Sequence, residues 1–203
     1  MSWQRLPAAI LVSTACVLCG SSVLAQQAAK KPDAKPEAKP AAARPATPTA
    51  PMMGGQQPSL LGQYGEWGAY TADPGGKKVC FALAKPGSTA TVPPNRPRDP
   101  TYVFVSTRPS EKVKDEISVI IGYGFKPGVD ATVQVGSASF LMYTQNDGAW
   151  VKNAADEAKL IDALRKGADL VVKGTSGRGT ASTDTYSLKG LAQALDRVAQ
   201  ECR

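Results

Sequence analysis

The sequence contains no histidine. Its absence excludes a Ser-His-Asp triad and a Cys-His pair as catalytic centres, and it removes the commonest nitrogen ligand of zinc sites. The glycine-containing stretches also miss the spacing of nucleotide-binding loops. We therefore expect no metal and no cofactor, and we expect that the chain is not an enzyme.

Cysteine is scarce as well, with four in the chain. The N-terminal sequence decides how many of them remain in the mature protein. Residues 1–7 are short and carry one positive charge, and residues 8–18 (AAILVSTACVL) form an apolar run. Val23, Leu24 and Ala25 place small or branched residues where a signal peptidase reads. This layout predicts a secretory signal peptide over residues 1–25, because the apolar run is too short to span a bilayer.

Cleavage after Ala25 leaves two cysteines, Cys80 and Cys202. In an oxidising compartment they permit one intramolecular pairing, so we predict a structural disulfide. Two free thiols or an intermolecular bridge are the alternatives. A nucleophilic Cys80 would need an activating base, and only Lys77 and Lys78 are nearby in sequence.

Residues 26–58 consist almost wholly of Ala, Pro, Lys and Gln. Such a composition cannot bury enough apolar surface to offset the loss of chain entropy, so it predicts a disordered linker. The linker carries five Lys/Arg against two Asp/Glu, so the basic excess of the folded part, residues 59–203, is smaller than the +7 of the whole chain suggests. A nucleic-acid partner is therefore not expected, whereas the basic linker could contact a membrane surface or cell wall.

Short runs rich in β-branched and aromatic residues dominate the rest, separated by Gly/Pro/Asn turns. This pattern predicts a mainly β fold, a sandwich or a barrel. The strands are expected at residues 64–71, 78–84, 102–107, 116–122, 131–135, 139–144, 149–151 and 170–173.

Two helices interrupt the strand pattern. The first should start at Asn153 as N-cap and stop at Gly167, with Ala158, Ile161 and Leu164 on one face. The second should start at Ser187 as cap and run over residues 188–201. Its apolar stripe contains Leu188, Leu191, Leu195, Val198 and Cys202.

The strand around Cys80 alternates large and small residues. Val79, Phe81 and Leu83 point one way, and Cys80, Ala82 and Ala84 point the other. We expect the large residues to fill the sandwich core and the small face to receive the last helix, where a Cys80–Cys202 bridge would hold it.

Two residues are candidates for partner binding. Arg178 lies in Gly174–Thr180 (GTSGRGT), which fails the phosphate-loop pattern because its lysine precedes the glycines, and so reads as a hairpin loop. Trp150 directly follows a turn, which makes it the aromatic most suited to exposure. The neighbouring carboxylates Asp115–Glu116 and Asp156–Glu157 point to different faces, so neither pair forms a ready acid/base dyad.

Three stretches together resemble the invasion-associated locus B family of alphaproteobacterial exported proteins. They are YGEWGAYT (residues 64–71), KKVCFALAKP (residues 77–86) and SGRGTASTDTYSLKGLAQALDRVAQEC (residues 176–202). The resemblance implies an immunoglobulin-like β-sandwich with appended helices and a periplasmic or outer-membrane location. In pathogenic relatives the family is associated with entry into host cells, and it offers no catalytic residues to carry over.

Together these observations predict an exported, non-enzymatic binding module of the cell envelope. Its expected partner is an envelope or extracellular protein or polymer, and its expected location is the periplasm, with outer-membrane association or secretion as alternatives. A structural or stress-related periplasmic protein without a specific ligand is the first alternative function. A hydrolase built on two carboxylates is the second.

Overall fold

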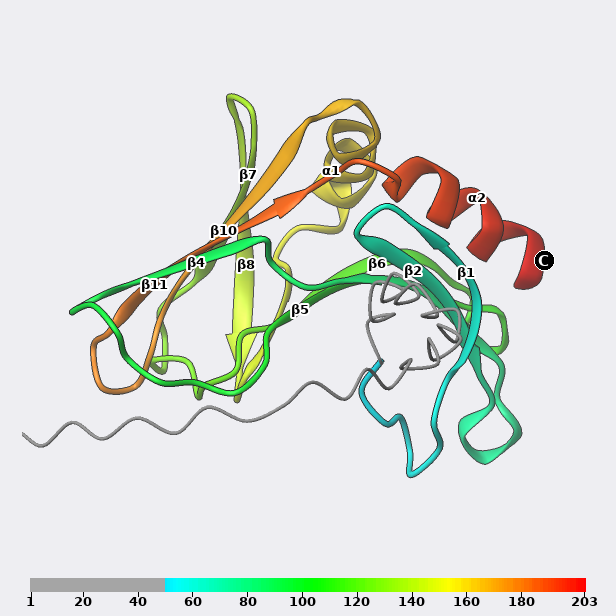
Figure 1. Cartoon of the computed structure of the whole chain (residues 1–203), viewed down its shortest axis with the longest axis horizontal. Helices are drawn as coiled ribbons and strands as arrows, with labels where there is room; N and C mark the ends of the chain where they lie inside the picture. The colour runs from blue at the N-terminus through cyan, green and yellow to red at the C-terminus, as the bar shows by residue number, and fades with distance from the viewer. Residues whose placement is uncertain (1–49) are drawn as a thin grey trace, which may run out of the picture. The chain divides into compact units, whose positions relative to one another are not determined.

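The strands pair into one antiparallel sheet. The computed structural model describes residues 50–203, and its eleven strands follow the order β1-β2-β3-β5-β6-β9-β8-β7-β10-β11-β4 (Figure 1). They are β1 (Ser59–Tyr64), β2 (Trp67–Ala72), β3 (Val79–Ala84), β4 (Ser88–Val92), β5 (Tyr102–Arg108), β6 (Val113–Ile120), β7 (Ala131–Val135), β8 (Ala138–Gln145), β9 (Gly148–Val151), β10 (Asp169–Thr175) and β11 (Ala181–Ser187).

Two α-helices, α1 (Ala154–Lys166) and α2 (Leu191–Glu201), accompany the sheet, with short 3-10 turns at Pro74–Gly76 and Pro109–Glu111. The fold class expected from the sequence is confirmed, since the domain is mainly β with two helices and a disulfide on the C-terminal one. The predicted signal peptide and most of the predicted linker lie outside the described residues.

One core joins the two halves of the sheet. Side chains from β2, β3, β5 and β6 meet side chains from β7, β8, β10 and β11 in a single buried cluster, to which both helices contribute. Leu160 and Leu164 enter from α1, and Leu191 and Leu195 enter from α2. The long sheet therefore folds over its own inner face in a sandwich-like arrangement.

The last helix packs where the small residues of β3 predicted it. Cys80, Ala82 and Ala84 are fully buried and share the main core with Leu195 and Val198 of α2. A disulfide joins Cys80 to Cys202, with 5.9 Å between their Cα atoms. The prediction of this pairing is confirmed.

The expected position of the large residues is wrong. Val79, Phe81 and Leu83 do not enter the main core but form a second buried cluster with Tyr70 and Phe104 on the opposite face of β3. The physical reason is that the helix takes the inner face of this strand, so the close-packing small residues line the main core.

The strand predictions are confirmed for most of the sheet, with three differences. Residues 64–71 are not one strand but the turn and second strand of a hairpin, β1–β2, closed between Tyr64 and Trp67. The strands β4 (STATV) and β11 (ASTDTYS) were not predicted, because Ser, Ala and Asp interrupt their strand-favouring Thr, Val and Tyr residues and neither contains a run of large apolar residues. β4 is an edge strand that pairs only with β11.

The first helix has the predicted ends. The Asn153 side chain accepts a hydrogen bond from the Ala155 amide at 3.0 Å, and Gly167 is the C-cap. Its buried positions are Leu160 and Leu164, whereas Ala158 is exposed, so the expected face is shifted by part of a turn.

The second helix starts later than predicted. Ser187 is the last residue of β11, not the helix cap, and Gly190 takes that position in the left-handed conformation. Leu188 lies before the helix, yet it is buried with the four other residues of the predicted stripe.

Residues 50–58, the end of the predicted linker, are among the described residues. Ala50 and Pro58 are buried, and the Gln57 side chain donates a hydrogen bond of 2.9 Å to the Ala50 carbonyl. Met53 and Gln56 pair across a tight turn.

Candidate functional site

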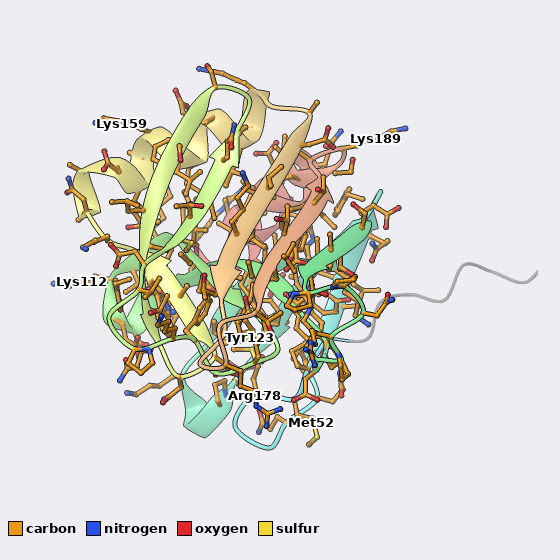
Figure 2. All side chains as sticks on the ribbon, turned by 90° about the vertical axis from the view of Figure 1, so that its left-hand side faces the viewer. Met52, Lys112, Tyr123, Lys159, Arg178 and Lys189 are labelled. Atoms are coloured by element: carbon orange, nitrogen blue, oxygen red, sulfur yellow. A yellow bond between two sulfur atoms is a disulfide. The ribbon has the colours of Figure 1, made fainter. Side chains whose placement is uncertain are left out.

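A groove lies where three connections of the sheet meet. It is formed by residues 91–99 after β4, residues 122–124 after β6, and residues 176–180 in the turn between β10 and β11. Its volume is about 920 Å³, which is in the range of small-molecule binding sites. Figure 2 shows Arg178 and Tyr123 at this end of the domain.

Backbone contacts hold the groove walls together. The Gly177 amide donates to the Gly124 carbonyl at 2.9 Å, and the Asp99 amide donates to the Gly122 carbonyl at 2.9 Å. Gly122 has a φ of +78°, and a Cβ atom there would lie 2.1 Å from the Asp99 carbonyl oxygen. Only glycine permits this approach, so the wall between residues 99 and 122 depends on it.

The inner face of β11 carries a buried polar row, Ser182, Asp184 and Tyr186. Each member bonds to a residue that precedes β5 or follows β6. The pairs are Tyr123–Ser182 at 2.6 Å between hydroxyls, Arg98–Asp184 with 2.8 Å from Nη1 to Oδ2, and Thr101–Tyr186 at 3.2 Å between hydroxyls. Two of these partners, Arg98 and Tyr123, also line the groove, so the row fixes their positions.

The Arg98–Asp184 pair is buried and bidentate. The Asp184 side chain is fully buried, and both of its oxygens accept from the Arg98 guanidinium, whose side chain is 9% exposed. The hydrogen bonds to Asp184 raise the pKa of Arg98, so the guanidinium stays charged. Burial raises the pKa of the Tyr123 phenol, which therefore stays neutral at physiological pH.

Two further arginines line the groove without a carboxylate partner. Arg178 and Arg96 are exposed, and neither side chain makes an ion pair or hydrogen bond with another described residue. The only carboxylate that lines the same groove within residues 50–203 is Asp99, also exposed. The groove thus combines a fixed wall with two unpaired guanidinium groups.

Trp150 lies elsewhere, on the outer face of the sheet. Its ring stacks on Tyr143 of the neighbouring strand, with centroids 5.6 Å apart and planes 23° from parallel. Tyr143 is 44% exposed and Leu141, two residues earlier on β8, is 53% exposed. We call these three residues the aromatic ledge, and none of them lines the groove.

The structure therefore separates the two residues predicted for partner binding: Arg178 belongs to the groove and Trp150 to the ledge. Sequence reasoning missed Arg96, Arg98 and Tyr123. Asp184 in ASTDTYS gave no usable signal, because its burial becomes evident only once β11 is known to be a strand with this face turned inward.

The structure brings the two predicted carboxylate pairs near each other, since Glu116 and Asp115 both raise the pKa of Glu157. Glu116 accepts from Arg108, and Glu157 accepts a hydrogen bond of 3.3 Å from the Ile117 amide. Neither pair lines the groove or the other cavities found at β4 and at β7–β10. Among the described residues, no group of three His, Cys, Asp or Glu side chains could hold a metal ion.

Two of the stretches that carry the family resemblance meet in space. The Trp67 indole donates to the Ser187 carbonyl at 2.8 Å, which links YGEWGAYT to the segment YSLKG. A Cβ atom at Gly190 would lie 2.0 Å from the Tyr64 carbonyl oxygen. These motifs therefore hold the β1–β2 turn against the start of α2.

No helix within the described residues is long and apolar enough to span a membrane. No curated protein and no solved structure matches the chain. A sequence model of one protein family, described as Invasion associated locus B (IalB) protein, matches residues 67–199. This range begins inside the first stretch of the resemblance and includes most of the last, together with β2 through most of α2. The chain therefore belongs to the invasion-associated locus B family.

Proposed function

We propose that this chain is an exported, non-enzymatic binding protein of the bacterial envelope, and that the groove is its binding site. The observation that carries the proposal is the pair of unpaired arginines, Arg96 and Arg178, beside a wall fixed by the β11 polar row. Fixed walls lower the ordering cost of binding, and guanidinium groups without partners are free to bind a ligand.

Family membership supports the same proposal. The family description links these proteins to invasion, an activity that requires contact with molecules outside the cell. The predicted signal peptide over residues 1–25 and the predicted linker to residue 58 fit a domain that works beyond the inner membrane.

Two alternatives stand beside it. A structural envelope protein would need no groove with unpaired charges, so the groove favours the binding function. A carboxylate hydrolase would need two carboxylates facing one cleft. Among residues 50–203, Asp99 is the only carboxylate that lines the groove, and Asp169 is the only one that lines the cavity at β7–β10.

Site-specific photo-crosslinking in intact cells tests the binding function. A photoreactive residue replaces Thr180 in the groove, Tyr143 on the aromatic ledge, or Gln193, which is exposed on α2 and serves as the control position. We expect a discrete, saturable adduct from Thr180 and none from Gln193. An adduct from Tyr143 alone would show that the binding site is the aromatic ledge and not the groove. Identical diffuse labelling at all three positions would support the structural alternative.

Export is tested separately. Fractionation of cells should place the protein outside the cytoplasm, and mass spectrometry of the mature chain should find its N-terminus at Gln26. An intact Met1 in the cytoplasmic fraction would contradict export.

A further inference from the structure

The seven arginines within residues 50–203 divide into four that pair with a carboxylate and three, Arg96, Arg178 and Arg203, that do not. Arg98, Arg108, Arg165 and Arg197 each pair with a carboxylate. Arg96 and Arg178 do not pair with any described residue, although they come from different connections and line the same groove. Two unpaired guanidinium groups that line one groove from separate segments are suited to hold a carboxylate or a phosphate.

The rest of the lining is not that of a simple anion site. Pro93, Pro97 and Tyr123 present apolar surfaces, and Thr91 and Thr180 supply hydroxyl groups. The Tyr123 ring is held in place by its 2.6 Å hydrogen bond to Ser182 and by its edge-on contact with Phe125 at 5.6 Å between centroids. Flat apolar surfaces next to hydroxyl groups fit a ring that has apolar faces and a polar edge.

The charges that line the groove further restrict the class of ligand that it can bind. Three arginines line the groove, but Asp184 neutralises Arg98, and Asp99 contributes a carboxylate of its own. A densely charged polyphosphate would be repelled by Asp99, whereas a ligand with a single acid group and several hydroxyls would use it as a hydrogen-bond acceptor.

We infer that the groove binds an acidic saccharide, with the acid group on Arg96 and Arg178, the hydroxyls on Asp99 and the threonines, and the ring against Tyr123 and the prolines. This inference names the ligand class of the groove and rests on the proposed binding function.

Titration calorimetry on the purified, oxidised full chain tests it with three probes: a galacturonate trisaccharide, the neutral galactose trisaccharide, and inorganic tripolyphosphate. The galacturonate trisaccharide should bind, more weakly as salt concentration rises, and at least about tenfold more tightly than the neutral sugar. Tripolyphosphate should bind less tightly than the acidic sugar.

Variants assign the binding to the groove. Arg178→Ala and Arg96→Ala should each weaken binding about tenfold, whereas Arg203→Ala, another exposed arginine without a partner among the described residues, should leave it unchanged. Gly124→Leu should abolish binding by filling the groove. A Cβ atom at Gly124 meets nothing within 4 Å and its φ is not left-handed, so this variant should fold. Gly87→Leu is the matched control, with a similarly open position outside the groove.

The inference is overturned if the acidic and neutral sugars bind equally, if neither binds, or if Arg178→Ala has no effect. Tighter binding of tripolyphosphate would also overturn it, in favour of a phosphorylated ligand. These results differ from failure of the proposed function, because a groove-specific crosslink at Thr180 without sugar binding would keep the binding function and reject only the ligand class.

Discussion

At the scale of single residues, glycines mark the places where two segments approach most closely. Gly190 has a φ of +95° at the start of α2, and a Cβ atom there would lie 2.0 Å from the Tyr64 carbonyl oxygen. Both the backbone conformation and the close contact therefore exclude a side chain. Packing against the β1–β2 turn therefore accounts for the glycine at position 190.

Gly190→Ala should lower the free energy of unfolding by at least about 2 kcal/mol, since the left-handed conformation costs alanine 1–2 kcal/mol and the clash adds to it. Urea denaturation followed by tryptophan fluorescence measures the change. Gly87→Ala is the control, because its Cβ would meet only the Thr185 carbonyl at 3.9 Å, and it should change stability little. Equal stabilities for the two variants would contradict the packing role.

The charge of Glu157 is unfavourable to the fold. Burial raises its pKa, the nearby Glu116 and Asp115 raise it further, and the hydrogen bond from the Ile117 amide lowers it. Because the folded-state pKa lies above the unfolded one, the penalty is absent below the unfolded pKa and fully present above the folded pKa.

Glu157→Gln should therefore stabilise the domain at pH 7, by less than about 1 kcal/mol because solvent screens this partly exposed group, and should leave it unchanged at pH 3, since the amide oxygen still accepts from Ile117. Denaturation at the two pH values measures the difference. Lys159→Gln, on the same helix, is a control for general effects on helix charge. Stabilisation of equal size at both pH values would refute the electrostatic explanation.

At the scale of elements, α2 depends on the small face of β3. Ala82 is fully buried in the cluster that contains Ala194, Leu195 and Val198 of the helix. Ala82→Leu should push the helix outward and destabilise the domain by about 1–3 kcal/mol, as extra methylene groups do in a filled core. Thermal unfolding measures it, and Ala90→Leu on the exposed edge strand β4 is the control. An unchanged melting temperature for Ala82→Leu would mean that the helix does not need this face.

The elements also show which sequence signals are strong. Alternation of large and small residues in VCFALA correctly predicted the face that meets α2, because period-two alternation in a strand has only two outcomes. It did not predict which face belongs to the main core, since that depends on how the whole sheet folds over. The start of α2 was missed because Ser187 can cap a helix or end a strand, and pairing with Asp169 on β10 decides for the strand.

At the scale of the whole molecule, the disulfide closes a loop that contains most of the described residues. Cys80 and Cys202 are 122 residues apart in sequence, and the ion pair Lys78–Glu201 at 2.8 Å lies beside them. Replacing both cysteines by alanine should cost roughly 4–5 kcal/mol on the chain-entropy account of disulfides. Guanidinium denaturation with and without reductant measures this. The wild type should become as unstable as the double variant when reduced, and a reductant effect on the double variant itself would contradict the assignment.

The groove could be predicted from the sequence only in part, for a reason that belongs to this scale. Arg178 was identifiable because a charged residue among turn glycines is exposed in almost any fold. Arg96 and Tyr123 lie in connections after different strands, β4 and β6, and only the order of strands in the sheet brings them together. No local pattern encodes that order, because it results from long-range pairing.

The buried Arg98–Asp184 pair is the polar counterpart of the disulfide, because it joins β11 to the segment that leads into β5. Arg98→Ala should destabilise the domain by about 3–5 kcal/mol, since it leaves the fully buried Asp184 carboxylate without its partner. The double variant Arg98→Leu/Asp184→Leu should recover most of this loss, because the cost comes from the orphaned charge. Chemical denaturation of Arg98→Leu, Asp184→Leu and the double variant measures the coupling between the two side chains. If the single and double variants are equally unstable, the pair matters through packing and not through the charge that a single variant leaves without a partner.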